Sequence, residues 1–179
     1  MPLLKLLERK EATGKAAQAY ALFDELGWIP KPFAIFSPSE HLLDVRRQVV
    51  AHRMNHPTLS RGFFALLRMV VAEELGYQYC VSFNAGILKN MGIADDDQLA
   101  AILADPSQAP LDDKEKALLL FVLKALKTPD QVTAQDLKQM RALGWSDGDI
   151  LEATVQGTDM KAMDTLFRIF KLDEDKSSC

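Results

Sequence analysis

The segment that follows Ser60 constrains the fold of this chain more than any other. Ser60 is a typical N-cap residue and Gly76 a typical helix end, so the residues between them are predicted to form a helix. A helix that is apolar on most sides has to lie in the middle of a packed bundle, because no face of it is suited to water. The apolar residues of this segment are Phe63, Phe64, Leu66, Leu67, Met69, Val70 and Val71.

The rest of the chain also carries helix signals. It has no sustained alternation of polar and apolar residues and no Asn-Gly or Asp-Gly turn, so no strand or hairpin is indicated. An all-α fold is therefore predicted. Helices are expected at about residues 13–26, 37–57, 85–91, 95–104, 115–126, 133–143 and 147–172, with one short turn at 33–36.

Two of these segments carry more detailed expectations. In the second, Pro38 fits the first turn, and four apolar residues keep helical spacing (Leu42, Val45, Val49 and Val50). In the last, Ser146 and Asp149 resemble a capping box. Gly157 lies inside that helix, where a glycine marks a kink or a close helix contact.

The domain organisation is simple. The chain has 179 residues, close to the size of one domain, and it contains no internal repeat and no low-complexity linker. We predict a single helical domain over residues 1–172, followed by a polar tail over residues 173–179.

Composition excludes several classes of protein. A net charge of -4 argues against a nucleic-acid partner, and the scattered glycines form no phosphate-binding loop, so no cofactor is expected. Two cysteines, Cys80 and Cys179, make no disulfide framework and fit a reducing cytoplasm. No signal peptide and no membrane-spanning segment are expected, because no apolar run is long enough.

The stretch from Tyr77 to Asn84 contains Cys80 in a setting typical of thiol redox sites. It resembles the C-x-x-C-x-x-x-H core of the AhpD-like alkylhydroperoxidases, within the carboxymuconolactone decarboxylase-like superfamily. Cys80 matches the second cysteine, Tyr77 stands at the position of the first, and Asn84 stands at that of the histidine. The resemblance, closest to the peroxidase-related subgroup, rests on three stretches in the same order: residues 11–38, 77–92 and 111–152.

The family's chemistry needs more groups than this chain supplies. A peroxidatic thiol needs a base to form the thiolate and a second sulfur to resolve the sulfenic acid. Tyr77 cannot resolve a sulfenic acid, and Asn84 cannot act as a base. The relay glutamate of the family falls on Ala65. Glu73 is the nearest carboxylate, together with Glu74, and would share a face with Tyr77, Cys80 and Asn84 only in an unbroken helix, which Gly76 disfavours.

Each candidate has a plainer reading. The alternative role for Cys80 is that of a small, buried apolar side chain without reactivity. The alternative role for Tyr77 is that of a packing residue. Asn84 is also a polar residue facing a former active-site cavity. Cys179 is a remote candidate for a resolving thiol.

His52 and His56 form an H-x-x-x-H pair, a spacing that can hold a metal ion on a helix face. Two ligands do not complete a site, so a third is needed, such as Glu40 or a residue of another subunit. The alternative is two surface histidines at a helix end.

Three functions follow from these readings. The first is a divergent AhpD-like protein that has lost redox chemistry and binds or transforms a small molecule, as the decarboxylase branch implies by needing no cysteine. The second is a one-cysteine peroxidase that reduces hydroperoxides through Cys80 with an external thiol. The third is a purely structural or interaction role. The resemblance also implies a homo-oligomer, a trimer or a hexamer.

Overall fold

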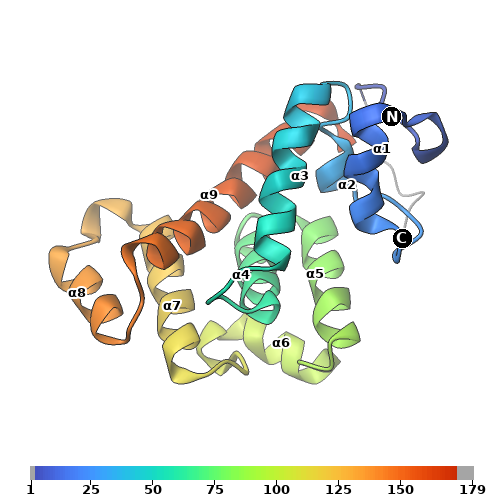
Figure 1. The fold of residues 1–179 in the computed structure, drawn as a ribbon. Coiled ribbons are helices and arrows are strands. Elements are labelled where there is room, and N and C mark those ends of the chain that lie inside the picture. The colour runs from blue at the N-terminus through green and yellow to red at the C-terminus, as the bar shows by residue number, and fades with distance from the viewer. Residues whose placement is uncertain (1–2, 173–179) are drawn as a thin grey trace. The chain divides into compact units, whose positions relative to one another are not determined.

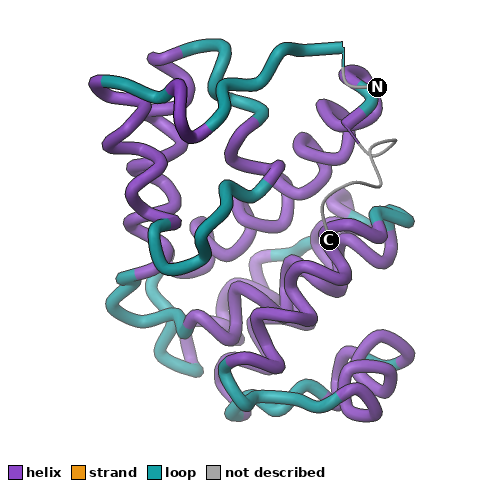
Figure 2. Tube along the Cα trace, turned by 90° about the vertical axis from the view of Figure 1, so that its right-hand side faces the viewer, coloured by secondary structure: helices purple, strands orange, loops and turns teal. Residues whose placement is uncertain are grey.

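The computed structural model describes residues 3–172, and within that range the chain is helical with no strand (Figures 1 and 2). The predicted polar tail and Cys179 lie outside the described residues. Short 3-10 helices, among them η2 (Ala21–Phe23) and η4 (Pro129–Gln131), join some of the α-helices. The α-helices are α1 (Gly14–Tyr20), α2 (Lys31–Ala34), α3 (Glu40–Met54), α4 (Arg61–Glu74), α5 (Gln78–Asn90), α6 (Asp96–Ala104), α7 (Asp113–Lys127), α8 (Ala134–Ala142) and α9 (Asp147–Phe170).

The described residues divide into two compact units. One unit contains the residues up to His56 and those from Thr165 onward, and the other contains Pro57–Asp164. The domain boundary expected at residue 172 stays a prediction.

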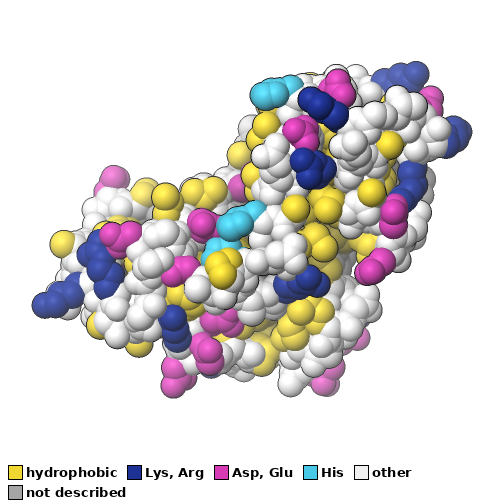
Figure 3. Space-filling model, in the orientation of Figure 1, with side chains coloured by type: hydrophobic (Ala, Val, Ile, Leu, Met, Phe, Trp, Pro, Cys, Tyr) yellow, Lys and Arg dark blue, Asp and Glu magenta, His cyan; other side chains and the backbone are white. Residues whose placement is uncertain are grey.

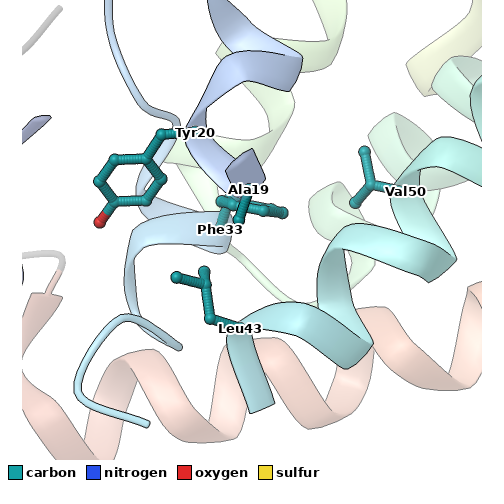
Figure 4. Close-up of a cluster of buried hydrophobic side chains, with 5 residues drawn as sticks. All are labelled: Ala19, Tyr20, Phe33, Leu43 and Val50. Carbon is teal, nitrogen blue, oxygen red and sulfur yellow. The ribbon is translucent and has the colours of Figure 1, made fainter. Parts of the chain in front are cut away.

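The first unit has its own hydrophobic core (Figure 4). Its buried members are Ala19, Tyr20, Phe33, Leu43 and Val50, contributed by α1, α2 and α3. The phenol of Tyr20 donates a hydrogen bond to the carbonyl oxygen of Leu7 at 2.8 Å, and the N–H of Leu7 donates to Ser37 Oγ at 2.8 Å. The residues before α1 are thereby attached to this core.

The first helix is shorter than the sequence predicted. It starts at Gly14, as expected from Thr13, but the regular α-helix ends at Tyr20 and continues only as η2. Gly27, the expected stop, has a φ of +72°, a conformation that glycine adopts without strain.

Of the four apolar residues that the spacing marked on α3, only Val50 is buried, and Leu43, on a stripe that the spacing did not mark, is buried as well. Ser39 is its N-cap, so Pro38 lies before the helix and not in its first turn. Leu43 and Val50 are buried, whereas the side chains of Leu42, Val45 and Val49 are exposed by 51%, 44% and 46%. Both stripes are apolar, and periodicity alone cannot distinguish them.

Helix α4 is the centre of the second unit, as predicted. Ser60 caps it by accepting a hydrogen bond from the N–H of Phe63 at 3.0 Å. Ten of its residues are buried: Gly62, Phe63, Phe64, Ala65, Leu66, Leu67, Met69, Val70, Val71 and Ala72. Helix α5 packs along α4, which it follows after a short turn (Figure 1).

The second unit also contains the close contact that Gly157 marked. A Cβ atom at Gly157 would lie 2.6 Å from Leu126 Cδ1 and 3.1 Å from Val122 Cγ1, so α9 approaches α7 more closely than a side chain would permit. The expected capping box at the start of α9 is present, with Ser146 N–H donating to Asp149 Oδ2 at 2.9 Å and Asp149 N–H donating to Ser146 Oγ at 3.1 Å.

Within residues 3–172, none of the helices combines the length and the apolar character needed to cross a bilayer.

Candidate functional site

The turn between α4 and α5 determines where the candidate site lies. Gly76 has a φ of +69°; its N–H donates to the carbonyl of Glu73 at 2.9 Å, and that of Tyr77 donates to the carbonyl of Ala72 at 2.8 Å. This pair of hydrogen bonds is a Schellman motif, which ends one helix at a glycine in the left-handed conformation. The chain then restarts at once, because Tyr77 is also the N-cap of α5.

Cys80 lies in the first turn of α5, three residues after the N-cap. The residue is 3% exposed and contributes a thiol rather than a disulfide. The N-terminal end of a helix carries partial positive charge and favours an anion such as a thiolate. Burial opposes this effect, because a charge is costly away from water.

Asn84 lies one turn after Cys80 and is 1% exposed. Its Nδ2 atom donates to the carbonyl oxygen of Cys80 at 2.7 Å, and its Oδ1 atom accepts from Arg68 Nε at 2.8 Å. Both ends of the carboxamide are therefore in use. Asn84 joins the backbone of α5 to a side chain of α4, and an amide in this position neither accepts nor releases a proton near neutral pH.

Arg68 is the site residue that the sequence reasoning missed. Its half-buried guanidinium donates a hydrogen bond to the side-chain amide of Asn84, inside the second unit. A single arginine within the apolar run from Phe63 to Val71 was the available signal. Ala65, at the position of the family's relay glutamate, is fully buried one turn before Arg68 and offers no polar group.

Aromatic side chains surround the start of α5. Tyr77 is buried, at 3% exposed, and its ring stacks on that of Tyr79 with centroids 6.2 Å apart. The ring of Tyr79 in turn stacks on that of Phe83, also at 6.2 Å. The position of the family's first cysteine is thus occupied by part of a packed aromatic row.

Glu73 is separated from the face that carries Cys80. It lies near the end of α4, before the break at Gly76, and it is exposed to solvent. Gln78 Nε2 donates to its carboxylate at 3.3 Å. Glu74 is exposed as well. The helix that would have aligned Glu73 with Tyr77, Cys80 and Asn84 is interrupted.

The expected metal ligands belong to the first unit. His52 lies in the last turn of α3 and His56 just after it, with ring centroids 5.1 Å apart. Glu40 starts the same helix, roughly 18 Å away by the helical rise, so it is not a third ligand on the same chain.

The arrangement around Cys80 supplies a thiol, a permanent positive charge on Arg68 and a neutral amide. Tyr77, Asn84 and Ala65 themselves supply a phenol, an amide and a methyl group, and none of the three is a thiol, an imidazole or a carboxylate.

Comparisons with known proteins bear on the fold. No protein-family model and no curated protein matches the chain. Several solved structures are similar, among them two peroxidase-related proteins. An uncharacterized peroxidase-related protein from Silicibacter sp. TM1040 has 18% identity and a TM-score of 0.76. An uncharacterized peroxidase-related protein from Ralstonia eutropha JMP134, described as an alkylhydroperoxidase AhpD core, has 15% identity and a TM-score of 0.77.

Each of these matches covers 95% of this chain and 90% of the other. The resemblance that the order of the three stretches suggested is therefore confirmed at the level of fold. The chain has the all-α fold of the AhpD-like, peroxidase-related proteins.

Proposed function

We propose that this protein is a divergent AhpD-like protein that does not operate a two-cysteine peroxidase relay and instead binds or transforms a small molecule. The observation that carries the proposal is that both ends of the Asn84 side-chain amide are hydrogen-bonded within the protein. The amide accepts a hydrogen bond from Arg68 Nε and donates one to the carbonyl of Cys80, and this supports a role in joining α4 to α5 rather than in proton transfer.

The same proposal includes the homo-oligomer, a trimer or a hexamer, that the resemblance implies. The exposed apolar stripe of Leu42, Val45 and Val49 on α3 supports it, because such residues favour association when they are covered. Light scattering coupled to size-exclusion chromatography tests this part. A monomer at micromolar concentration would contradict it.

A one-cysteine peroxidase is the second candidate, favoured by the place of Cys80 in the first turn of α5. In that reaction the Cys80 thiolate attacks the distal oxygen of a hydroperoxide, the O–O bond breaks, and an alcohol and a sulfenic acid form. One external thiol then gives a mixed disulfide and water, and a second restores Cys80 and leaves as its own disulfide.

A peroxidase assay distinguishes the two candidates. Hydrogen peroxide and an organic hydroperoxide are each supplied with dithiothreitol, and wild type is compared with Cys80→Ser in a Cys179→Ser background. We expect no turnover beyond that of free thiol and no effect of Cys80→Ser. Turnover well above the free-thiol rate that is lost in Cys80→Ser would establish the peroxidase.

A second experiment tests whether a cysteine at position 77 and a histidine at position 84 would give this fold peroxidase activity. The variant Tyr77→Cys/Asn84→His restores the C-x-x-C-x-x-x-H pattern on this fold. We expect it to gain thiol-dependent peroxidase activity relative to wild type.

A thermal-shift screen of small carboxylic acids and ketones tests the binding half of the proposal, which fails if no compound raises the melting temperature.

A further inference from the structure

The strongest feature outside the candidate site is the pair of histidines at the C-terminal end of α3. His52 is exposed and His56 is half-exposed, and Figure 3 shows histidine side chains at the surface. Their imidazole rings meet edge to face, with centroids 5.1 Å apart and an interplanar angle of 67°. Neither residue takes part in the chemistry considered for Cys80.

The separation of the two rings matches the geometry of a shared ion. Nitrogen–zinc distances of about 2.0–2.1 Å at a tetrahedral angle place the centres of two coordinating imidazoles roughly 5 Å apart. One potential ligand nitrogen of His52 and one of His56 lie within 4.8 Å of each other. Both the separation of the rings and that of the nitrogens therefore fall in the range of a shared metal ion.

The backbone between the two histidines is held in place by Asn55, the C-cap of α3. The N–H of Asn55 donates to the carbonyl of His52 at 3.0 Å, and its Nδ2 donates to the carbonyl of Ala51 at 2.9 Å. The two rings therefore project from a fixed turn, which lowers the entropy lost on binding.

The dipole of α3 favours a cation at the end that carries the two histidines, and Arg53 in the same turn is an opposing positive charge. The C-terminal end of a helix carries partial negative charge, and a divalent ion at this position interacts favourably with it. Imidazole nitrogen is a ligand for zinc, copper and nickel, whereas magnesium and calcium require oxygen ligands.

We propose that His52 and His56 supply the two protein ligands of a site for a divalent transition-metal ion, and that water takes the coordination positions that further protein ligands fill in a structural zinc site. Zinc is the probe of choice because it takes imidazole readily and has no redox chemistry.

Calorimetric titration of the EDTA-treated full chain with zinc chloride tests the proposal, in a Cys179→Ser background that removes the terminal thiol. His41 provides a matched control, because it is an exposed histidine on the same helix. We expect about one zinc ion per chain. His52→Ala and His56→Ala should each weaken binding by about tenfold or more, because the chelate loses one of two protein ligands, and His41→Ala should leave it unchanged.

Copper(II) provides a second readout that does not depend on heat. The electron paramagnetic resonance spectrum should show coupling to two imidazole nitrogens in wild type and to fewer in either single variant. The variants His52→Gln and His56→Gln keep a polar side chain and replace the alanines if melting curves in EDTA show a folding defect. The proposal is overturned if zinc binding survives loss of both histidines, if His41→Ala weakens it equally, or if magnesium chloride competes for the site.

Discussion

Arg68 Nε donates a hydrogen bond to Asn84 Oδ1 at 2.8 Å, and this contact joins α4 to α5 beside the backbone of Cys80. A charged donor on a buried amide gives one of the stronger hydrogen bonds available to a protein. The contact therefore stabilises the pair of helices that carries Cys80.

Replacing Asn84 with alanine should destabilise the protein. The change removes the acceptor for Arg68 and the donor to the Cys80 carbonyl, and we expect a loss of about 1–3 kcal/mol in the free energy of unfolding. Urea denaturation measures it. Asn90→Ala is the matched control, because Asn90 is an exposed asparagine on the same helix and should cost far less.

A double-mutant cycle isolates the contact between the two side chains. Arg68→Met keeps the aliphatic stem and removes the donor. If the hydrogen bond matters, the effects of Arg68→Met and Asn84→Ala should be less than additive, by about 1 kcal/mol. Strict additivity would mean that the two residues stabilise the protein independently.

Gly157→Ala should destabilise the contact between α7 and α9. The new methyl group would lie 2.6 Å from Leu126 Cδ1 and 3.1 Å from Val122 Cγ1. Leu126 can move in part, but the branched Val122 cannot easily do so, and we expect overpacking to exceed the gain in helix propensity by about 1 kcal/mol.

Gly86 provides the opposite case on α5. A Cβ atom there would meet nothing within 4 Å, so Gly86→Ala should stabilise the protein by up to about 1 kcal/mol. Thermal melting of Gly157→Ala and of Gly86→Ala measures the destabilising and the stabilising effect. Equal shifts of the same sign would contradict the packing argument.

Protonation of the Asp136 carboxylate should make the protein less stable in acid. Hydrogen bonds from Lys124 Nζ, and then from the backbone and hydroxyl of Thr133, lower its pKa to about 2. A carboxylate with a lowered pKa stabilises the folded state fully above the ordinary value near 4, and loses this effect as the pH falls toward 2.

The melting temperature of Asp136→Asn should accordingly lie below that of wild type at neutral pH, and the gap should narrow between about pH 4 and pH 2. Asp130→Asn changes an exposed aspartate of the neighbouring η4 and serves as the control. A gap that stays constant over this range would refute the assignment.

Cys80 should behave as a buried side chain when it is replaced. Cys80→Ala should cost about 1 kcal/mol, and Cys80→Ser should cost more, because it buries a hydroxyl in place of a thiol. In a Cys179→Ser background, a disulfide reagent should modify Cys80 at least about tenfold more slowly in the native protein than in denaturant. Fast modification of the native protein would favour the one-cysteine peroxidase.

Helix ends were the part of the structure most readily predicted from the sequence. Ser60, Gly76 and Ser146 act through hydrogen bonds to groups within a few residues, so their signals are local. The face of α3 was harder to predict. Leu42 and Leu43 are adjacent and equally apolar, and only the packing against Phe33 and its neighbours determines that Leu43 is the buried one.

The sequence by itself determined that this protein is all-α, because residue types and their spacing fix helix periodicity and helix ends. Only the tertiary structure decided what Asn84 does. Its partner Arg68 lies sixteen residues away on another helix, and no local pattern specifies which side chains of two packed helices meet.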